Sequence, residues 1–193
     1  GTGAVLHATG ERNLGRLGGL IHRMPWVAWL TLVGALAIAG LPPLNGFVSE
    51  WLLLQAFLFA DTVPRPFVNM LLPIGAALVA LCAALSGYVM VKFFGVIFLG
   101  QPREPTLAQA HDAGLLERIG LAWLAVACVV LGILPVQVIG ALDAVSRDLL
   151  GTQLGQGVAQ WWLLAPIPAR GASYGPLALL LAGAILTGLT VLA

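Results

Sequence analysis

The sequence contains few charged residues, few cysteines and few histidines. Asp, Glu, Lys and Arg make up 9 % of its 193 residues, against about 25 % in a soluble domain. The formal net charge of +1 offers no basic surface for nucleic acid. Two separated cysteines and three scattered histidines indicate no disulfide framework and no metal site. These scarcities exclude a disordered chain, a nucleic-acid-binding protein and an ordinary cytosolic enzyme.

The sequence is instead rich in apolar residues, which occur in long intervals without charge. Hydrophobic residues form 60 % of the chain, and the mean hydropathy is +0.98. A membrane-spanning helix needs about 20 apolar residues to cross roughly 30 Å of hydrocarbon. Four of the intervals meet this requirement, whereas 149–169 is rich in Gly, Gln and Pro. The intervals without Asp, Glu, Lys or Arg are 24–49, 66–91, 119–142, 149–169 and 171–193.

This pattern predicts an all-α, polytopic transmembrane helix bundle with one discontinuous helix. Residues 1–99 should hold the end of one helix at 1–8, a broken helix at 26–60 and a further helix at 71–99. The chain begins without methionine and ends within an apolar run. We therefore expect it to be a piece of a longer membrane protein.

Residues 100–193 are expected to contribute two more transmembrane helices, at about 117–141 and 174–193. Between them we expect an interfacial loop at 143–173, because its central part, 149–169, is poor material for a spanning helix. The pair Trp161-Trp162 lies in this loop, and indole rings favour the headgroup level of a bilayer.

Arginines in the short loops predict the orientation in the membrane. Loop 9–25 carries three arginines, and loop 100–116 carries Arg103, with Arg118 directly after it. The opposite side has fewer arginines. Because short loops rich in Lys and Arg remain on the cytoplasmic side, we expect loops 9–25 and 100–116 to be cytoplasmic.

The span 26–60 should be interrupted by its proline pair. Its 35 residues are too many for one straight crossing and too few for two. Pro42 and Pro43 lack the N–H group that a helix needs, and Gly46 follows closely. We expect the helix to stop before the prolines and restart near Asn45. Unpaired backbone inside a membrane is tolerated only against protein or a watery cavity, so the break favours an ion pathway. A plain loop between two re-entrant pieces is the alternative.

Glu50 is the leading candidate for chemistry, because it lies about one turn into the second half-helix. Loss of solvation favours the neutral carboxyl, whereas the start of a helix favours the carboxylate. These opposed effects suit a group that binds and releases a proton. The alternative is an acid at the membrane surface, directly after a short span that ends at Ser49.

Lys92 and His7 are the secondary candidates. Lys92 is the only charged residue in a long apolar stretch, and its ammonium could pair with Glu50 or could reach the headgroups along its flexible stem. His7 lies near the end of the first helix. Imidazole carries protons readily near neutral pH, although a lone histidine at a helix end is commonly structural.

Several runs of residues together resemble the antiporter-like proton-pumping membrane subunits of respiratory complex I, membrane-bound hydrogenases and multisubunit sodium/proton antiporters. The proline pair, the Ser-Glu pair and the run Lys92-Phe93-Phe94-Gly95 are most similar to the hydrogenase-4 component B (formate hydrogenlyase subunit 3) group. The resemblance covers about residues 1–105. The runs are His7-Ala8-Thr9-Gly10, Arg16-Leu17-Gly18-Gly19-Leu20, Met24-Pro25, Leu36-Ala37-Ile38-Ala39-Gly40-Leu41-Pro42-Pro43 and Gly46-Phe47-Val48-Ser49-Glu50.

The resemblance implies an inner (plasma) membrane subunit that translocates protons within a larger redox-driven complex. It implies that 26–60 is the broken helix of the second of two inverted repeats, with Glu50 on the proton exit path and Lys92 on the next helix. His7 would follow the helix that holds central residues of the path. Redox centres in this family lie in other subunits, so no catalytic centre, cofactor or metal is expected in this chain.

Two other functions fit the same residues. The first is a subunit of a multisubunit Na⁺/H⁺ antiporter, in which Na⁺ exchange replaces redox drive. The second is a structural membrane scaffold, in which Glu50 and Lys92 pair only to fix helix packing. All three functions have the lipid bilayer and other membrane subunits as partners. The redox-driven subunit and the antiporter subunit also bind protons.

Overall fold

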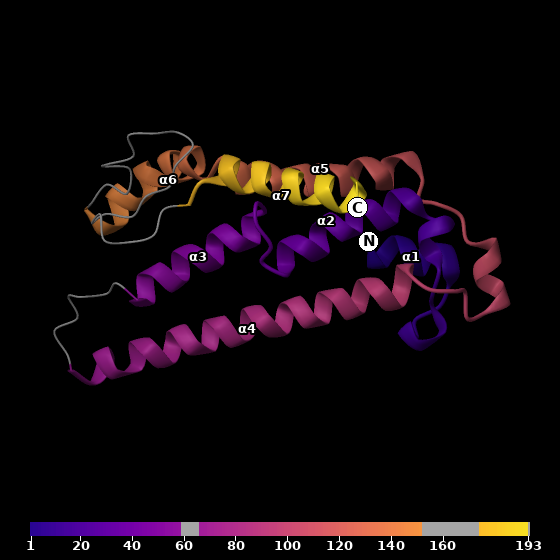
Figure 1. The fold of residues 1–193 in the computed structure, drawn as a ribbon, viewed down its shortest axis with the longest axis horizontal. Helices are drawn as coiled ribbons and strands as arrows, with labels where there is room; N and C mark the ends of the chain where they lie inside the picture. Colours follow the sequence, from indigo (N-terminus) through magenta and orange to yellow (C-terminus); the bar gives the residue numbers. More distant parts are fainter. Residues whose placement is uncertain (59–65, 152–173, 193) are drawn as a thin grey trace. The chain divides into compact units, whose positions relative to one another are not determined.

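The computed structural model describes residues 1–58, 66–151 and 174–192, whose regular structure is helical (Figure 1). Seven α-helices and three short 3₁₀ turns follow one another along the described chain. The α-helices are α1 Thr2–Thr9, α2 Pro25–Ile38, α3 Asn45–Leu58, α4 Pro66–Phe98, α5 Leu115–Ile133, α6 Pro135–Leu150 and α7 Pro176–Leu192. The 3₁₀ turns are η1 Leu14–Arg16, η2 Leu20–His22 and η3 Pro105–Gln109.

The architecture is that of an all-α polytopic membrane protein, as the sequence predicts. Helices α4 and α5 are each long and apolar enough to cross a bilayer, and most of their residues are exposed in this chain. The described chain forms two compact units. Unit 1 comprises Gly1–Ala39 and Cys82–Cys128, and unit 2 comprises Gly40–Leu81 and Val129–Ala193.

The predicted break in the first span is present. Helix α2 ends at Ile38 and α3 begins at Asn45, with Pro42 and Pro43 in the turn between them. Gly40 has a φ of +66°, the left-handed conformation that commonly ends a helix and that glycine adopts without strain. Each half has 14 residues and is therefore about 21 Å long, shorter than the hydrocarbon core.

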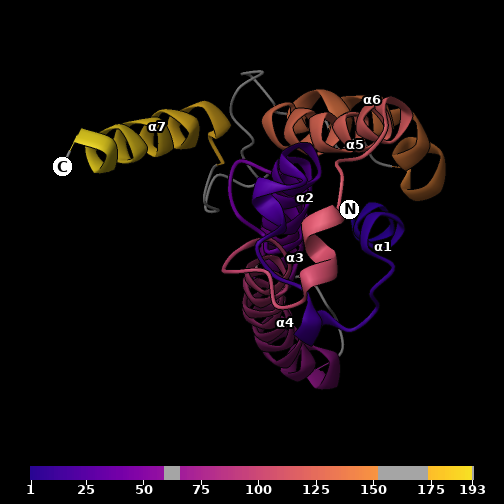
Figure 2. The ribbon, with the colours of Figure 1, turned by 90° about the vertical axis from the view of Figure 1, so that its right-hand side faces the viewer.

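Unit 1 has a dense apolar core at the end that holds the loops. Met24, Val27 and Ala28 are fully buried, and they pack with Leu20 from η2 and Phe98 from the end of α4. The turn η3 packs against α1 and contributes the buried Leu107 (Figure 2). The resulting core holds together segments that are widely separated in the sequence.

Two glycines explain how the loops of unit 1 approach so closely. The amide of Gly19 donates a 3.0 Å hydrogen bond to the carbonyl of Leu99. A Cβ atom on Gly18 would lie 2.6 Å from the carbonyl oxygen of Gln101, well inside van der Waals contact. The Gly18-Gly19 pair therefore permits backbone to lie against backbone, which ties loop 9–25 to the chain that leaves α4.

Unit 2 has a smaller core around one aromatic residue. Tyr174 and Val48 are buried, and Phe47 and Trp51 of α3 pack against them with Val136 of α6. The segments that meet here are the start of α3, the start of α6 and the residue just before α7.

The helix expected at 117–141 is divided in the structure. Helix α5 ends at Ile133 and α6 begins at Pro135, because a proline there has no N–H for the carbonyl four residues earlier. Residues 143–150, which we expected in the interfacial loop, belong to α6. The rest of that loop, with Trp161 and Trp162, lies almost wholly outside the described residues. The helix expected at 71–99 begins earlier, at Pro66.

Candidate functional site

The carboxylate of Glu50 lies against the helix break. A Cβ atom built on Gly40 would be 3.0 Å from the carboxyl carbon of Glu50 and would collide with one of its oxygens. Gly40 therefore leaves the space that the carboxylate occupies. Glu50 is partly buried. Within the described part of the chain, its side chain makes no hydrogen bond and no ion pair.

Helix α5 supports the turn that contains the proline pair. A Cβ atom on Gly132 would overlap the carbonyl oxygen of Pro43 and lie 2.7 Å from the carbonyl carbon of Leu44. The backbone of α5 thus touches the backbone of the turn. This contact with α5 holds the turn in place. The turn needs such support, because it lacks the continuous backbone hydrogen bonds of a helix.

Tyr174 connects the end of α5 with the start of α3. Its hydroxyl donates a buried 3.2 Å hydrogen bond to the carbonyl of Gly132, close to the end of α5, where helix carbonyls lack an intrahelical partner. Its ring lies 5.5 Å from the ring of Phe47 and 6.0 Å from that of Trp51. No pattern in the sequence indicates Tyr174, because it is a single aromatic residue at the start of the helix expected at 174–193.

Unit 2 also contains buried polar oxygens without a partner. Among the described residues, the side-chain oxygens of Asn45, Gln55 and Ser146 are buried and accept no hydrogen bond. We expected Asn45 to cap the start of α3. Asn45 is the first residue of α3, but its side-chain oxygen accepts no hydrogen bond from the described residues. Bound water commonly satisfies such groups, so these oxygens are suited to hold water within unit 2.

Lys92 lies in unit 1, on an exposed face of α4. Its ammonium nitrogen is 5.9 Å from the centre of the Tyr88 ring, one turn earlier on the same helix. On the same helix, the Ser86 hydroxyl donates a 3.1 Å hydrogen bond to the carbonyl of Ile38 at the end of α2. Glu50 belongs to unit 2, so the pairing of Lys92 with Glu50 stays a prediction.

His7 lies in the last turn of α1 and is exposed. It lines a cavity of about 390 Å³ together with His111, Asp112 and Glu117. All of these residues belong to unit 1. In the sequence His7 is an isolated histidine, because His111 lies more than 100 residues away and neither residue belongs to a spaced motif.

Asp112 caps helix α2 from a distant part of the chain. Its carboxylate accepts hydrogen bonds from the backbone N–H groups of Trp26 (3.0 Å) and Val27 (3.4 Å). The guanidinium of Arg118 lies 3.7 Å from the same carboxylate and 5.9 Å from the Trp26 ring. A carboxylate at this position satisfies the free N–H groups of the helix and complements its dipole.

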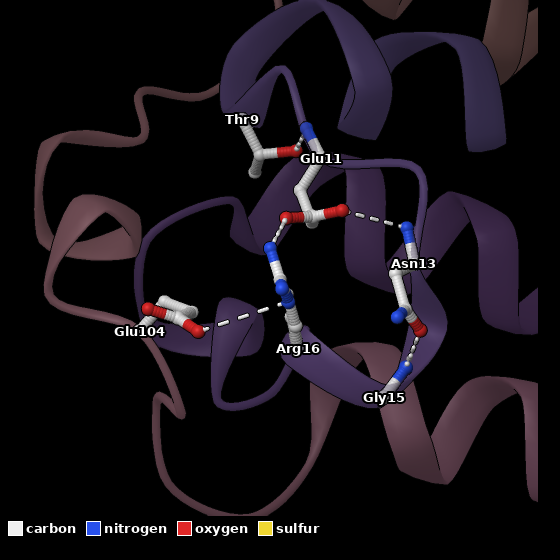
Figure 3. A network of polar contacts seen from close by, with 6 residues as sticks. All are labelled: Thr9, Glu11, Asn13, Gly15, Arg16 and Glu104. Atoms are coloured by element: carbon white, nitrogen blue, oxygen red, sulfur yellow. Dashed lines mark hydrogen bonds and ion pairs between the residues drawn. The ribbon is translucent and has the colours of Figure 1, made fainter.

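A second polar network orders loop 9–25 (Figure 3). The Glu11 carboxylate accepts a 2.8 Å hydrogen bond from the amide of Asn13 and lies 3.6 Å from the Arg16 guanidinium. Arg16 also contacts Glu104 at 4.0 Å. The backbone hydrogen bond from Asn13, followed by the backbone N–H of Arg12 and then the charge of Arg16, lowers the pKa of Glu11 below its ordinary value.

Comparison with protein families identifies the first part of the chain. Residues 2–72 match the transmembrane family described as NADH:quinone oxidoreductase/Mrp antiporter. This range contains α1, α2, the proline turn and α3, and therefore includes the helix break and Glu50.

Curated relatives have names from two kinds of complex. Formate hydrogenlyase subunit 3 of Escherichia coli K12 is 38 % identical over 69 % of this chain and 22 % of its own length. Hydrogenase-4 component B of the same organism is 32 % identical over 69 % of this chain and 20 % of its own. Na⁺/H⁺ antiporter subunit A1 of Staphylococcus saprophyticus is 32 % identical over 78 % of this chain and 19 % of its own. The chain spans about a fifth of the length of these relatives.

A solved structure extends the likeness to nearly the whole chain. The chain is similar to part of the membrane-bound sulfane sulfur reductase, an archaeal respiratory membrane complex, with a TM-score of 0.75 and 27 % identity. The match covers 98 % of this chain and 28 % of that one. It therefore includes α5 to α7, which lie beyond the range of the family match.

Proposed function

We propose that this chain belongs to the antiporter-like membrane subunit family and translocates protons as part of a redox-driven complex of the hydrogenase or NADH:quinone oxidoreductase type. The observation that carries the proposal is Glu50, a partly buried acid beside the helix break that has no hydrogen-bond or ion-pair partner among the described residues. An ion pair would hold the carboxylate permanently charged, whereas a group without one can bind and release protons.

The surroundings of Glu50 support this role. The turn at Pro42 and Pro43 leaves backbone groups that need water or protein partners, and three buried side-chain oxygens in unit 2 have none among the described residues. A chain of water molecules at this place could relay protons to and from the carboxylate. Gly46 lies in the first turn of α3, the half-helix whose dipole would favour a charged carboxylate near its start.

Lys92 and His7 have subsidiary roles in the proposal. A positive charge near Glu50 would favour its carboxylate, so movement of protons past Lys92 would load and unload the acid in turn. His7 would exchange protons at the other end of the path. We place the chain in the inner (plasma) membrane, with loops 9–25 and 100–116 in the cytoplasm and other membrane subunits beside it.

The test replaces Glu50 by Gln in the complete complex reconstituted into vesicles. Glu50→Gln keeps the shape and removes the titration, so we expect proton uptake to fall severely while the complex still assembles. Asp148→Asn, an exposed acid of α6, is the matched control and should retain uptake. Undiminished uptake in Glu50→Gln would support the structural scaffold and refute the proposal.

Na⁺/H⁺ exchange is the second candidate function, because one curated relative is named as an Na⁺/H⁺ antiporter subunit. The two functions differ in what drives the protons. Proton movement that requires an imposed Na⁺ gradient and ignores the electron donor would establish the antiporter. Proton movement that follows electron transfer in Na⁺-free buffer would establish the redox-driven subunit.

A further inference from the structure

We propose that the cavity lined by His7, His111 and Glu117 is a proton-collecting vestibule, which takes protons from water and delivers them to the path. This inference rests on the proposed function and adds the place where protons enter. The cavity has a volume of about 390 Å³ and is bounded by α1, residues 111–114 and the first turn of α5. Its other lining residues are small, so its chemistry comes from the ionisable groups.

Of the four ionisable residues that line the cavity, one has a structural role and three are available to exchange protons. The side chain of Asp112 is only 10 % exposed and is engaged by α2 and Arg118. His7, His111 and Glu117 are exposed, and within the described residues none of them makes a hydrogen bond or an ion pair. The nearby cation is Arg118, which is paired with Asp112.

The combination of residue types suits exchange of protons with water. Imidazole titrates near neutral pH and carboxylates titrate several units lower. An imidazole therefore holds a proton long enough to pass it on, while a neighbouring carboxylate attracts the next one. Groups in fixed ion pairs, such as Asp112 with Arg118, do not exchange protons in this way.

The supply of protons explains why such a surface is useful. At pH 7 the free proton concentration is about 10⁻⁷ M, so direct capture at about 10⁹–10¹⁰ M⁻¹s⁻¹ gives only about 10²–10³ protons per second. Enzymes commonly turn over at about 1–10³ per second. Supply and turnover are therefore comparable, and several surface groups that share one cavity enlarge the target for capture.

The position of the cavity fits entry from the cytoplasm. We expect loops 9–25 and 100–116 to be cytoplasmic. Loop 9–25 follows α1 and loop 100–116 leads into α5, and these two helices bound the cavity. Because the cap of Asp112 on α2 anchors residues 111–113, His111 is held beside the cavity. The vestibule is thus part of the ordered core of unit 1.

The test uses the double variant His111→Gln with Glu117→Gln in the complete complex in vesicles. Proton uptake is measured in nearly unbuffered medium and with about 50 mM imidazole buffer on the cytoplasmic side, because a mobile buffer replaces a collecting surface. We expect roughly fivefold slower uptake at low buffer, where capture is limiting, and nearly normal uptake at high buffer. His22→Gln, an exposed histidine of η2 outside the cavity, is the matched control and should behave as native.

Each outcome separates this inference from the proposed function. Glu50→Gln should slow uptake at both buffer concentrations, because added buffer does not replace a group inside the path. Equal uptake by the double variant and the native complex at low buffer would overturn the vestibule, and so would a loss that buffer does not relieve. If the double variant fails to assemble, His111→Gln alone is measured in the same way. An unaffected Glu50→Gln would refute the proposed function whatever the double variant does.

Discussion

The loop end of unit 1 and the helix break of unit 2 use charge in opposite ways. In unit 1, Glu11 and Asp112 lie beside arginines and accept backbone hydrogen bonds. In unit 2, Glu50 lies against Gly40 with no such partner among the described residues. Paired charges fix the geometry of loops. An acid without a partner fixes nothing, so its presence in an apolar helix requires a different reason.

Energies support this distinction. An exposed ion pair contributes about 0.2–1 kcal/mol, which a loop can gain or lose without changing the fold. A charged acid at the centre of a membrane helix costs roughly 2.5–3.5 kcal/mol on insertion scales. On the proposed proton path, a charged Glu50 would therefore reduce stability, as is expected of a residue that serves ion transfer.

We expect the largest loss of stability from substitutions at Tyr174, which holds α3 against the end of α5. Tyr174→Ala removes a buried ring and should destabilise unit 2 by about 3–5 kcal/mol. Tyr174→Phe keeps the ring contacts with Phe47 and Trp51 and loses only the bond to Gly132, which is worth about 0.5–1.5 kcal/mol. Thermal unfolding of the purified complex in detergent measures both. Equal losses in the two variants would show that the hydroxyl, and not the ring, supports the break.

A second, more local change tests whether Gly40 makes room for Glu50. Gly40→Ala should cost about 1–2 kcal/mol for the left-handed backbone and should also displace the carboxylate, so proton uptake should fall as in Glu50→Gln. Gly34→Ala in α2, where a Cβ atom meets nothing within 4 Å, is the matched control. Normal uptake in Gly40→Ala would mean that the position of the carboxylate beside the break is unimportant.

In unit 1, where the acids lie beside arginines, we expect a smaller loss of stability from substitutions at Asp112. Asp112→Ala leaves two N–H groups of α2 without their acceptor and should cost about 1 kcal/mol, within the usual range for helix caps. Asp112→Asn retains an acceptor oxygen and should lose less. The difference between the two thermal midpoints measures the cap. If Asp112→Asn is as unstable as Asp112→Ala, the ion pair with Arg118 is the dominant contribution.

The smallest effect is expected at Glu11. Because the pKa of Glu11 is lowered in the folded chain, its contribution is present above the ordinary carboxyl pKa and is lost as pH falls through the lowered value. Glu11→Gln should therefore change the thermal midpoint slightly at pH 7 and leave it unchanged in strong acid. A larger difference in acid than at pH 7 would contradict the assigned hydrogen bond from Asn13.

The sequence predicts the helix break well, because Pro42 and Pro43 act through local covalent chemistry. A missing N–H group disrupts a helix whatever surrounds it. The same reasoning applies to Pro135, where α5 ends. The uninterrupted apolar interval 119–142 concealed that break, since composition alone does not distinguish a straight helix from a divided one.

Other parts of the candidate site depend on distant contacts and leave no trace in the sequence. Tyr174 lies 42 residues beyond the carbonyl it binds. His111 lines the same cavity as His7, and η3, which precedes His111, packs on α1. No spacing rule connects such residues. Folding of the backbone brings them together, so the structure was needed to find them.

The cap on α2 has a consequence for the order of biosynthesis. Trp26 and the carboxylate of Asp112 are separated by 86 residues. At about 5–20 residues per second, a ribosome adds that length in roughly 4–17 s. During this interval the first half of the broken helix enters the membrane with an unfinished end. Completion of α2 must therefore wait until α4 has been made, which sets a minimum length of nascent chain for a mature unit 1.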